Sequence, residues 1–101
     1  MAGFLKVATL SEVPGGSAKA VDAGGTPLAL YNVGGRIYAT TNTCPHRGGP
    51  LGEGELEERT ITCPWHAFQY DVTTGACLTN PALSVTCYPV RIEEQDILIQ
   101  V

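Results

Sequence analysis

Long hydrophobic runs are missing from this chain of 101 residues. The longest uninterrupted apolar run covers residues 28–31, whereas a membrane-spanning helix needs about 18 apolar residues. We therefore expect no transmembrane helix. The first residues reach a lysine at position 6 with no apolar segment of signal-peptide length behind it, so we expect a cytoplasmic protein.

Basic charge is also scarce. Six Lys and Arg residues stand against ten Asp and Glu residues, which gives a formal net charge of -4 and a pI near 4.9. Phosphate backbones and anionic lipid surfaces attract positive charge rather than negative charge. We therefore expect neither nucleic acid nor a membrane among the partners.

Helical periodicity is the third missing feature. No stretch longer than about ten residues repeats apolar side chains at helical spacing, and 12 Gly and 7 Pro residues interrupt the chain at short intervals. The pattern predicts an all-β fold. A tight hairpin is predicted at Gly34-Gly35, because this pair separates two strand-like runs at residues 28–33 and 36–40. We expect a second hairpin through the polar turn 93–96, further strands at 4–9 and 17–21, a turn at 14–16, and at most one helical turn at 11–13.

The composition fits one small domain. Apolar residues make up 44% and charged residues 16% of the chain, which favours a packed globule over a disordered chain. A core of this size is marginal unless a metal or a disulfide stabilises it. We expect a single domain over residues 1–101.

The candidate metal-binding residues lie in two short segments of the sequence. The chain reads Cys44-Pro45-His46, then sixteen residues, then Cys63-Pro64-Trp65-His66. Each pair offers one thiolate and one imidazole, so two loops could hold one metal centre from opposite sides. These donors suit iron-sulfur clusters and zinc rather than calcium or magnesium. Zinc fingers pair Cys with Cys and His with His, a spacing that is absent here, but a structural zinc-binding interaction module stays an alternative.

The motif C-x-H followed by C-x-x-H resembles the binding motif of the Rieske [2Fe-2S] proteins. Residues 44–52 and 63–66 look like the two cluster loops of the soluble Rieske-type ferredoxins that serve aromatic-ring oxygenases. The resemblance implies a Rieske-like antiparallel β-sandwich or small barrel with a two-loop cluster-binding subdomain over about residues 43–81. It implies one [2Fe-2S] cluster, with one iron held by two cysteines and the other by two histidines. The implied ligands are Cys44, His46, Cys63 and His66.

The family implies a one-electron carrier without catalysis or a small-molecule substrate of its own. Its expected protein partners are a ferredoxin reductase and a terminal oxygenase of the aromatic-ring dioxygenase class. The alternative within the family is the small Rieske subunit of an NADH-dependent nitrite reductase.

The residues around the loops predict a low to intermediate reduction potential. Replacing two thiolates by two neutral histidines brings the oxidised cluster from a charge of about -2 to about zero, so Rieske potentials lie above those of all-cysteine clusters, within roughly -150 to +300 mV. Gly49 and Trp65 stand where high-potential relatives carry a disulfide. Phe68 stands where those relatives have a serine that donates to a cluster sulfur. Tyr70 stands at their tyrosine donor, so we expect Tyr70→Phe to lower the potential.

Ala67 departs from the family, which usually has glycine directly after the second histidine. If position 67 needs a positive φ, alanine costs about 1 kcal/mol there. Residues 73–75 resemble the turn after the second loop, and residues 80–82 resemble the proline-containing third loop that shields the cluster.

Two further groups are open to more than one interpretation. Cys77 and Cys87 lie outside the motif, and we expect small buried apolar residues there, although a disulfide between them is an alternative. The acidic residues of 53–58 form either a solvated strand or turn or a docking edge for basic partners.

Overall fold

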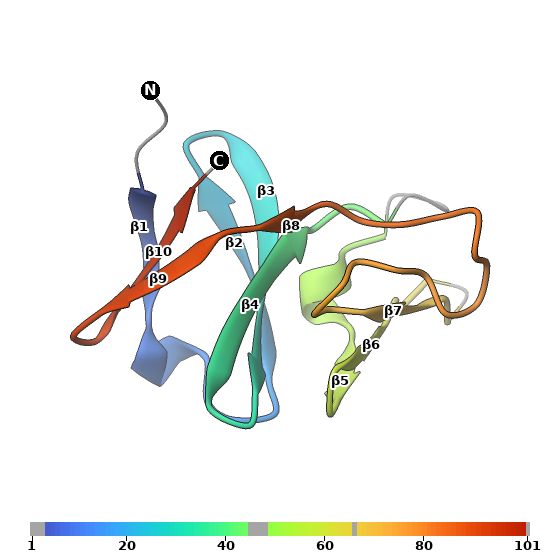
Figure 1. Cartoon of the computed structure of the whole chain (residues 1–101), viewed down its shortest axis with the longest axis horizontal. Helices are drawn as coiled ribbons and strands as arrows, with labels where there is room; N and C mark the ends of the chain where they lie inside the picture. The colour runs from blue at the N-terminus through green and yellow to red at the C-terminus, as the bar shows by residue number, and fades with distance from the viewer. Residues whose placement is uncertain (1–3, 45–48, 66, 101) are drawn as a thin grey trace.

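The computed structural model describes residues 4–44, 49–65 and 67–100 (Figure 1). These residues form an almost entirely antiparallel β structure, which confirms the all-β prediction. No helix among them has the length and apolar character needed to cross a membrane. The strands are β1 (Phe4–Thr9), β2 (Ala18–Ala23), β3 (Thr26–Val33), β4 (Arg36–Thr41), β5 (Glu55–Glu57), β6 (Thr60–Thr62), β7 (Gln69–Asp71), β8 (Cys87–Tyr88), β9 (Val90–Glu93) and β10 (Asp96–Gln100), and two 3-10 turns are η1 (Leu10–Glu12) and η2 (Leu51–Glu53).

Glycine pairs make the two hairpins of the central sheet. Gly34 and Gly35 link β3 to β4 with φ values of 61° and 96°, the positive angles of a two-residue turn that matches strand twist. This confirms the predicted hairpin. Gly24 and Gly25 link β2 to β3 with nearly the same angles, 62° and 96°, a hairpin that the sequence analysis did not predict. The polar turn at residues 93–96 also joins two strands as predicted, β9 and β10.

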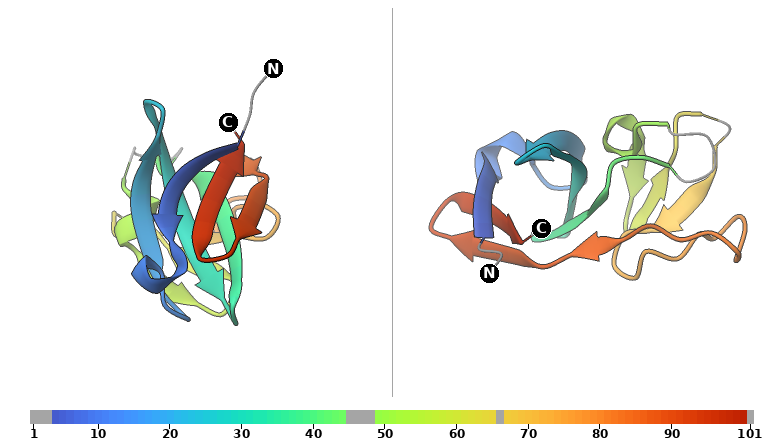
Figure 2. Two further views of the ribbon diagram at one scale, coloured as in Figure 1. Left: turned by 90° about the vertical axis from the view of Figure 1, so that its left-hand side faces the viewer. Right: turned by 90° about the horizontal axis from the view of Figure 1, so that it is seen from above.

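Two sheets pack against each other to form the larger part of the molecule. One has the order β1-β10-β9 and the other β2-β3-β4-β8, and the end-on view in Figure 2 shows them closing around a common interior. This is the expected β-sandwich or small barrel. Its core consists of aliphatic side chains from both sheets and of Val13, which directly follows η1. The buried members are Ala8, Val13, Ala23, Leu28, Leu30, Ile37, Ala39, Ile97 and Ile99.

The third sheet, β5-β6-β7, lies beside the barrel together with the long connections that flank it (Figures 1 and 2). It has its own group of buried side chains, which includes Cys44 and Cys63. The three strands of this sheet lie within residues 43–81, where the subdomain was expected, but its buried group also takes Ala29, Tyr31 and Val85 from outside that range.

Strand β3 connects the two parts because it is buried on both faces. Leu28 and Leu30 point into the barrel core, whereas Ala29 and Tyr31 belong to the buried group of the third sheet. Alternate side chains of a strand point to opposite faces, so a strand between two packed layers is apolar throughout. This explains why the longest apolar run of the sequence lies at residues 28–31.

Candidate metal centre

The first cysteine loop begins where β4 ends. The side-chain oxygen of Asn42 accepts a hydrogen bond from the Gly52 N–H at 2.7 Å, which ties the start of the loop to η2. The Cys44 N–H donates to the Gly49 carbonyl at 2.9 Å, so the loop closes on either side of residues 45–48, which lie outside the described residues. Cys44 is 1% exposed. The loop therefore holds this thiol inside the protein.

The second cysteine loop connects β6 to β7. The Cys63 N–H donates to the Phe68 carbonyl at 2.7 Å and closes the loop at its base. Cys63 is 1% exposed, like its counterpart in the first loop. Ala67 has φ 58°, the left-handed region that glycine adopts more readily than any other residue. The positive φ at position 67 explains why the family usually has glycine directly after the second histidine.

The two buried thiols face each other. Burial raises the pKa of the Cys63 thiol, the Trp65 N–H that donates to it has the opposite effect, and its hydrogen bond with Cys44 raises the pKa further. Gly49 allows the two loops to approach, because a Cβ at this position would lie 2.8 Å from Cys63 Sγ and 3.0 Å from Trp65 Cγ. The two loops therefore hold the two thiols in contact with each other inside the protein.

Tyr70 contributes a hydroxyl to the same site. Its oxygen lies 3.1 Å from Cys44 Sγ, and its side chain is fully buried. Burial raises the pKa of Tyr70, and the hydrogen bond with Cys44 raises it further, so the hydroxyl keeps its proton. The predicted tyrosine donor thus reaches a cysteine sulfur. Phe68 brings no hydroxyl and packs, partly buried, against the same group of side chains.

The connection that follows β7 forms the third loop. Asp71 accepts hydrogen bonds from the Thr73 N–H at 2.9 Å and hydroxyl at 2.6 Å, and Gly75 completes the turn with φ 86°. Further along, the Gln69 N–H donates to Thr79 Oγ1 at 3.0 Å. These bonds hold the proline-containing segment at residues 80–82 beside β7, the strand that carries the tyrosine of the site.

Cys77 and Cys87 are both free. Cys77 is buried, as expected, and its sulfur accepts the Asn80 N–H at 3.2 Å. The expectation of a buried Cys87 is wrong, because this residue is exposed on the short strand β8. A two-residue strand at the sheet margin covers its side chains incompletely. The described structure does not contain the alternative disulfide between them.

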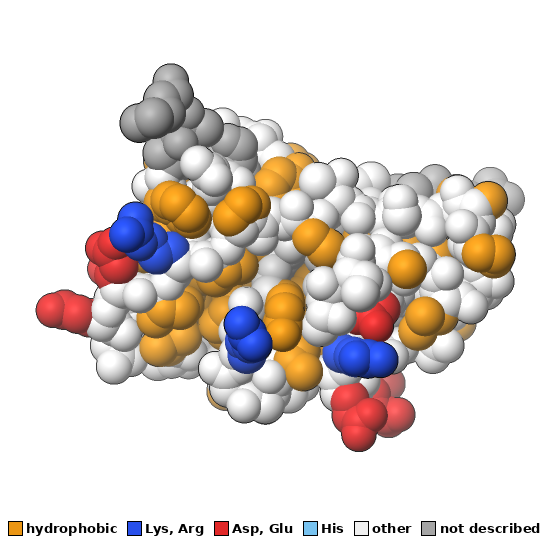
Figure 3. All heavy atoms as spheres, viewed as in Figure 1, with side chains coloured by type: hydrophobic (Ala, Val, Ile, Leu, Met, Phe, Trp, Pro, Cys, Tyr) orange, Lys and Arg blue, Asp and Glu red, His pale blue; other side chains and the backbone are white. Residues whose placement is uncertain are grey.

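Acidic and aromatic side chains surround the second loop on the outside. Trp65 is 49% exposed, so it shields the site only in part. Figure 3 shows acidic side chains at the tip of the β5–β6 hairpin and exposed hydrophobic ones over the third loop. A hollow of about 340 Å³ lies between η2 and β5 on one side and the second loop on the other, and its lining includes Glu53, Glu55, Cys63, Pro64 and Ala67.

The described residues fit the thiolate half of the predicted ligand set. Cys44 and Cys63 come from two different loops and meet in a buried position, with a hydroxyl donor beside them. Thiolates of this kind suit zinc and iron-sulfur centres, and the hydroxyl suits a negatively charged sulfur centre in particular. His46 and His66 lie outside the described residues, so the imidazole half of the set stays a prediction.

Sequence reasoning missed two supporting residues. Asn42 binds the backbone of η2, and Cys77 contacts both the third loop and the tyrosine of the site. An asparagine before the first loop is a weak signal because asparagine is common in turns. Nothing in the motif spacing identifies Cys77, whose contacts exist only after the chain has folded.

Comparison with known proteins agrees with this geometry. The sequence profile of the Rieske [2Fe-2S] domain matches residues 3–89. The ferredoxin component of the naphthalene 1,2-dioxygenase system of Pseudomonas aeruginosa is 41% identical over 97 residues, which are 95% of this chain and 93% of that protein.

Solved structures share the fold. A chain in the complex of reduced oxygenase and oxidized ferredoxin in carbazole 1,9a-dioxygenase matches with a TM-score of 0.87 and 33% identity, over 96% of this chain and 92% of that one. A Mycobacterium tuberculosis chain assigned to the small subunit of an NADH-dependent nitrite reductase has a TM-score of 0.89 over 100% of this chain and 96% of its own. At 22% identity, that second likeness shows the fold alone.

Proposed function

The chain belongs to the Rieske [2Fe-2S] domain family, and we propose that it passes single electrons from a reductase to the terminal oxygenase of an aromatic-ring dioxygenase system. It carries one [2Fe-2S] cluster and is an electron-transfer component rather than the oxygenase itself. The observation that carries the proposal is the pair of buried thiols, Cys44 and Cys63, that two loops bring together beside a tyrosine hydroxyl.

Four side chains hold the cluster in this proposal. Cys44 and Cys63 bind one iron, and His46 and His66 bind the other. The contact between the two thiols supports their sharing one iron, because both sulfurs must then lie within one tetrahedral coordination sphere. Each histidine follows its cysteine closely in the sequence, so the same two loops supply the imidazoles. The bound cluster accepts one electron and releases it again.

Tyr70 influences the reduction potential of the cluster. Its hydroxyl donates a hydrogen bond to the Cys44 sulfur, which gains negative charge when the cluster is reduced, so the bond stabilises the reduced state and raises the potential. Phe68 supplies no second donor of this kind. The potential therefore falls below that of family members with both donors, within the Rieske range of roughly -150 to +300 mV.

The partners meet the protein near the second loop. Trp65 is half-exposed there, and Glu53 and Glu55 line the hollow beside it. With an overall charge of -4, the protein is attracted to basic surfaces on a reductase and an oxygenase, which speeds encounter. The ferredoxin–oxygenase complex named above supports the oxygenase as a partner, and the reductase is the electron donor that such a multicomponent system implies. The free Cys77 and Cys87 suit a reducing compartment, so we place the exchange in the cytoplasm.

The test is spectroscopy on the purified holoprotein, with iron and sulfide assayed on the same sample. We expect the metal and sulfide content of one [2Fe-2S] cluster, and in the reduced state a rhombic EPR signal with the low average g value of mixed Cys/His coordination. His66→Cys should move the signal and the potential toward those of all-cysteine clusters, near -400 mV. The matched control is Cys87→Ser, which lies outside both loops and should change neither. Zinc without iron, or an unchanged signal in His66→Cys, would contradict the proposal.

A further inference from the structure

Asn42 joins the first cysteine loop to two other parts of the protein. Its backbone N–H donates to the Pro27 carbonyl on β3 at 3.1 Å. Its backbone carbonyl accepts the Leu51 N–H at 2.7 Å, and its side-chain oxygen accepts the Gly52 N–H, also at 2.7 Å. One residue, two positions before Cys44, thus binds both a strand of the barrel and the η2 turn.

The bonds to η2 satisfy amides that have no acceptor within the turn itself. The first N–H groups of a helical turn point away from its own carbonyls. Pro50 precedes η2 and has no N–H, and the next two amides, those of Leu51 and Gly52, both donate to Asn42. Gly52 is buried. Removal of the Asn42 side-chain oxygen would therefore leave a buried N–H without its acceptor, which is costly.

η2 in turn lies directly against the barrel. A Cβ on Gly52 would lie 2.6 Å from the backbone nitrogen of Ala20 on β2, so the absence of a side chain allows this approach. Leu51 is fully buried in the same group of side chains as Cys44 and Cys63. The turn therefore lies packed between the barrel and the two cysteines, and Asn42 attaches the first loop to it.

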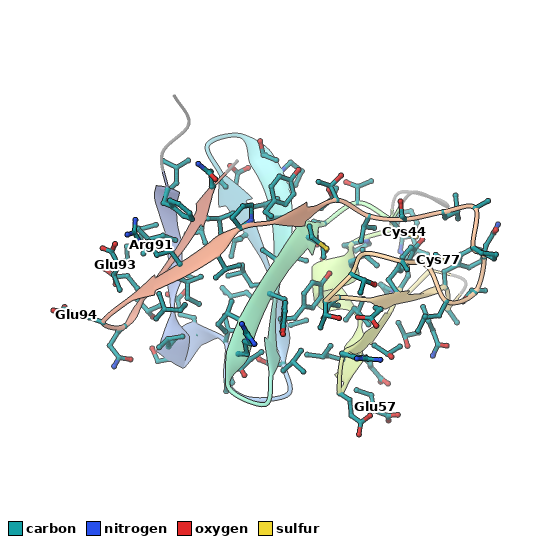
Figure 4. The ribbon with its side chains drawn as sticks, viewed as in Figure 1. Cys44, Glu57, Cys77, Arg91, Glu93 and Glu94 are labelled. Carbon is teal, nitrogen blue, oxygen red and sulfur yellow. The ribbon has the colours of Figure 1, made fainter. Side chains whose placement is uncertain are left out.

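The pairing between the two arms of the first loop continues toward the metal site. Thr43 and Pro50 form an antiparallel bridge, and the Cys44 N–H donates to the Gly49 carbonyl at 2.9 Å. Gly49 lies against the second loop, because a Cβ there would be 2.8 Å from Cys63 Sγ. Figure 4 shows Cys44 in the part of the molecule that contains the third sheet. A movement at the base of the first loop would therefore move Cys44 relative to Cys63.

We propose that Asn42 is a positioning residue for the cluster. Its side-chain oxygen fixes the start of the first loop on η2 and thereby holds the Cys44 thiolate where it shares one iron with Cys63. The inference rests on the proposed function, since it takes both cysteines as ligands. A ligand that is held in the binding geometry stays on the metal, whereas a loosely held thiolate leaves it more often and gives way to water or to a chelator.

The test measures how quickly the oxidised holoprotein releases iron to EDTA, followed by the loss of visible absorbance well below the melting temperature. Asn42→Ala removes the acceptor and should accelerate this release about tenfold or more, the usual size of the effect when a group that orients metal ligands is removed. EPR of the reduced variant should show broader g components, because the position of Cys44 then varies between molecules. Asn42→Asp keeps an oxygen at the same distance from the backbone and should restore slow release and narrow lines.

Asn32 offers a matched control within the barrel. Its side-chain oxygen also accepts a glycine N–H, that of Gly35 at 2.8 Å, and its side-chain N–H donates to the Val13 carbonyl at 2.8 Å. Asn32→Ala should lower the melting temperature without changing the rate of iron release or the EPR line widths. If Asn32→Ala released iron as fast as Asn42→Ala does, general stability would explain the effect and the inference would be wrong.

Two further results would overturn the inference. One is an unchanged rate of iron release in Asn42→Ala, and the other is an Asn42→Asp variant that releases iron as fast as the alanine variant. Should the alanine variant fail to fold, Asn42→Leu keeps the volume of the side chain but has no acceptor, and the same faster release is expected.

Iron, sulfide and EPR measured on the unmodified chain separate the inference from the proposed function. A chain without a [2Fe-2S] cluster would overturn both. A normal cluster whose release rate and EPR line widths do not depend on Asn42 would overturn the inference alone.

Discussion

Replacing Ala67 by glycine measures the backbone strain in the second cysteine loop. Ala67 adopts φ 58°, where an L-residue costs about 1–2 kcal/mol. Glycine avoids this cost but loses about 0.5–1 kcal/mol more conformational entropy on folding. The alanine methyl is exposed, so its removal sacrifices little packing. We expect Ala67→Gly to raise the free energy of unfolding by about 0.5–1 kcal/mol, or the melting temperature by roughly 2–8 °C for a domain of this size.

The assay is thermal denaturation of the holoprotein, followed through the visible absorbance of the cluster. Because cluster loss is irreversible, the variants are compared at one fixed scan rate. The matched control is Glu94→Gly. Glu94 has φ 60° and is exposed in the β9–β10 turn, at the opposite end of the molecule from the cluster loops (Figure 4). The same backbone relief applies there, so a similar rise is expected without any contribution from the cluster.

The comparison has a clear refuting outcome. If Glu94→Gly melts higher and Ala67→Gly melts at the same temperature or lower, then φ does not limit the stability of the second loop. The alanine would then stabilise the loop in a way that the geometry does not reveal, and the strain argument would be wrong. If neither variant gains stability, left-handed strain is unimportant throughout this protein.

Three further predictions follow from the site. Gly49→Ala places a methyl 2.8 Å from a cysteine sulfur and should lower the free energy of unfolding by about 1–3 kcal/mol, which a lower melting temperature and a lower iron content would show. In the control Gly15→Ala, the new methyl meets no atom within 4 Å, so we expect no change. Equal effects of the two substitutions would contradict the close-approach argument. Glu55→Lys should lower the rate at which this protein reduces the oxygenase of a naphthalene dioxygenase system, by about tenfold or less, and should make that rate less dependent on ionic strength. The control Glu94→Lys, at the far end of the molecule, should leave the rate unchanged. Identical rates for the two variants would place the docking surface elsewhere. Removing the iron should broaden the amide NMR signals of β5–β7 while those of β1–β4 persist, and native dispersion throughout the apoprotein would oppose this.

Local turn chemistry and the ligand motif were predictable from the sequence. Gly34-Gly35 specifies a two-residue turn because few other residues adopt two successive positive φ angles. Cys44 and Cys63 were assigned to one centre because the spacing of the two motifs resembles a known family, and the structure brings their thiols together. The family pattern marked position 67 as one where glycine is usual, and the structure shows the reason, a φ of 58° at Ala67.

Side-chain contacts between distant segments were not predictable in the same way. The bond between Tyr70 and Cys44 joins residues 26 positions apart, and its existence depends on how β7 packs behind the first loop. Cys87 was expected to be buried because cysteine usually is, but the short β8 leaves it exposed. Periodicity identifies which faces of a strand are apolar, whereas it does not identify what covers each face.

The third sheet depends on the barrel for its stability. Each of its strands has only three residues, and a sheet that small is marginal unless a neighbouring layer covers it. The layer is β3, whose Ala29 and Tyr31 belong to the same buried group as Cys44 and Cys63. The Tyr31 hydroxyl is in turn hydrogen-bonded to Thr40 Oγ1 on β4 at 2.8 Å, so the side chain that supports the cluster loops is fixed by the barrel. The two groups of buried side chains thus meet on the two faces of one strand, β3, and we expect the barrel and the third sheet to unfold together.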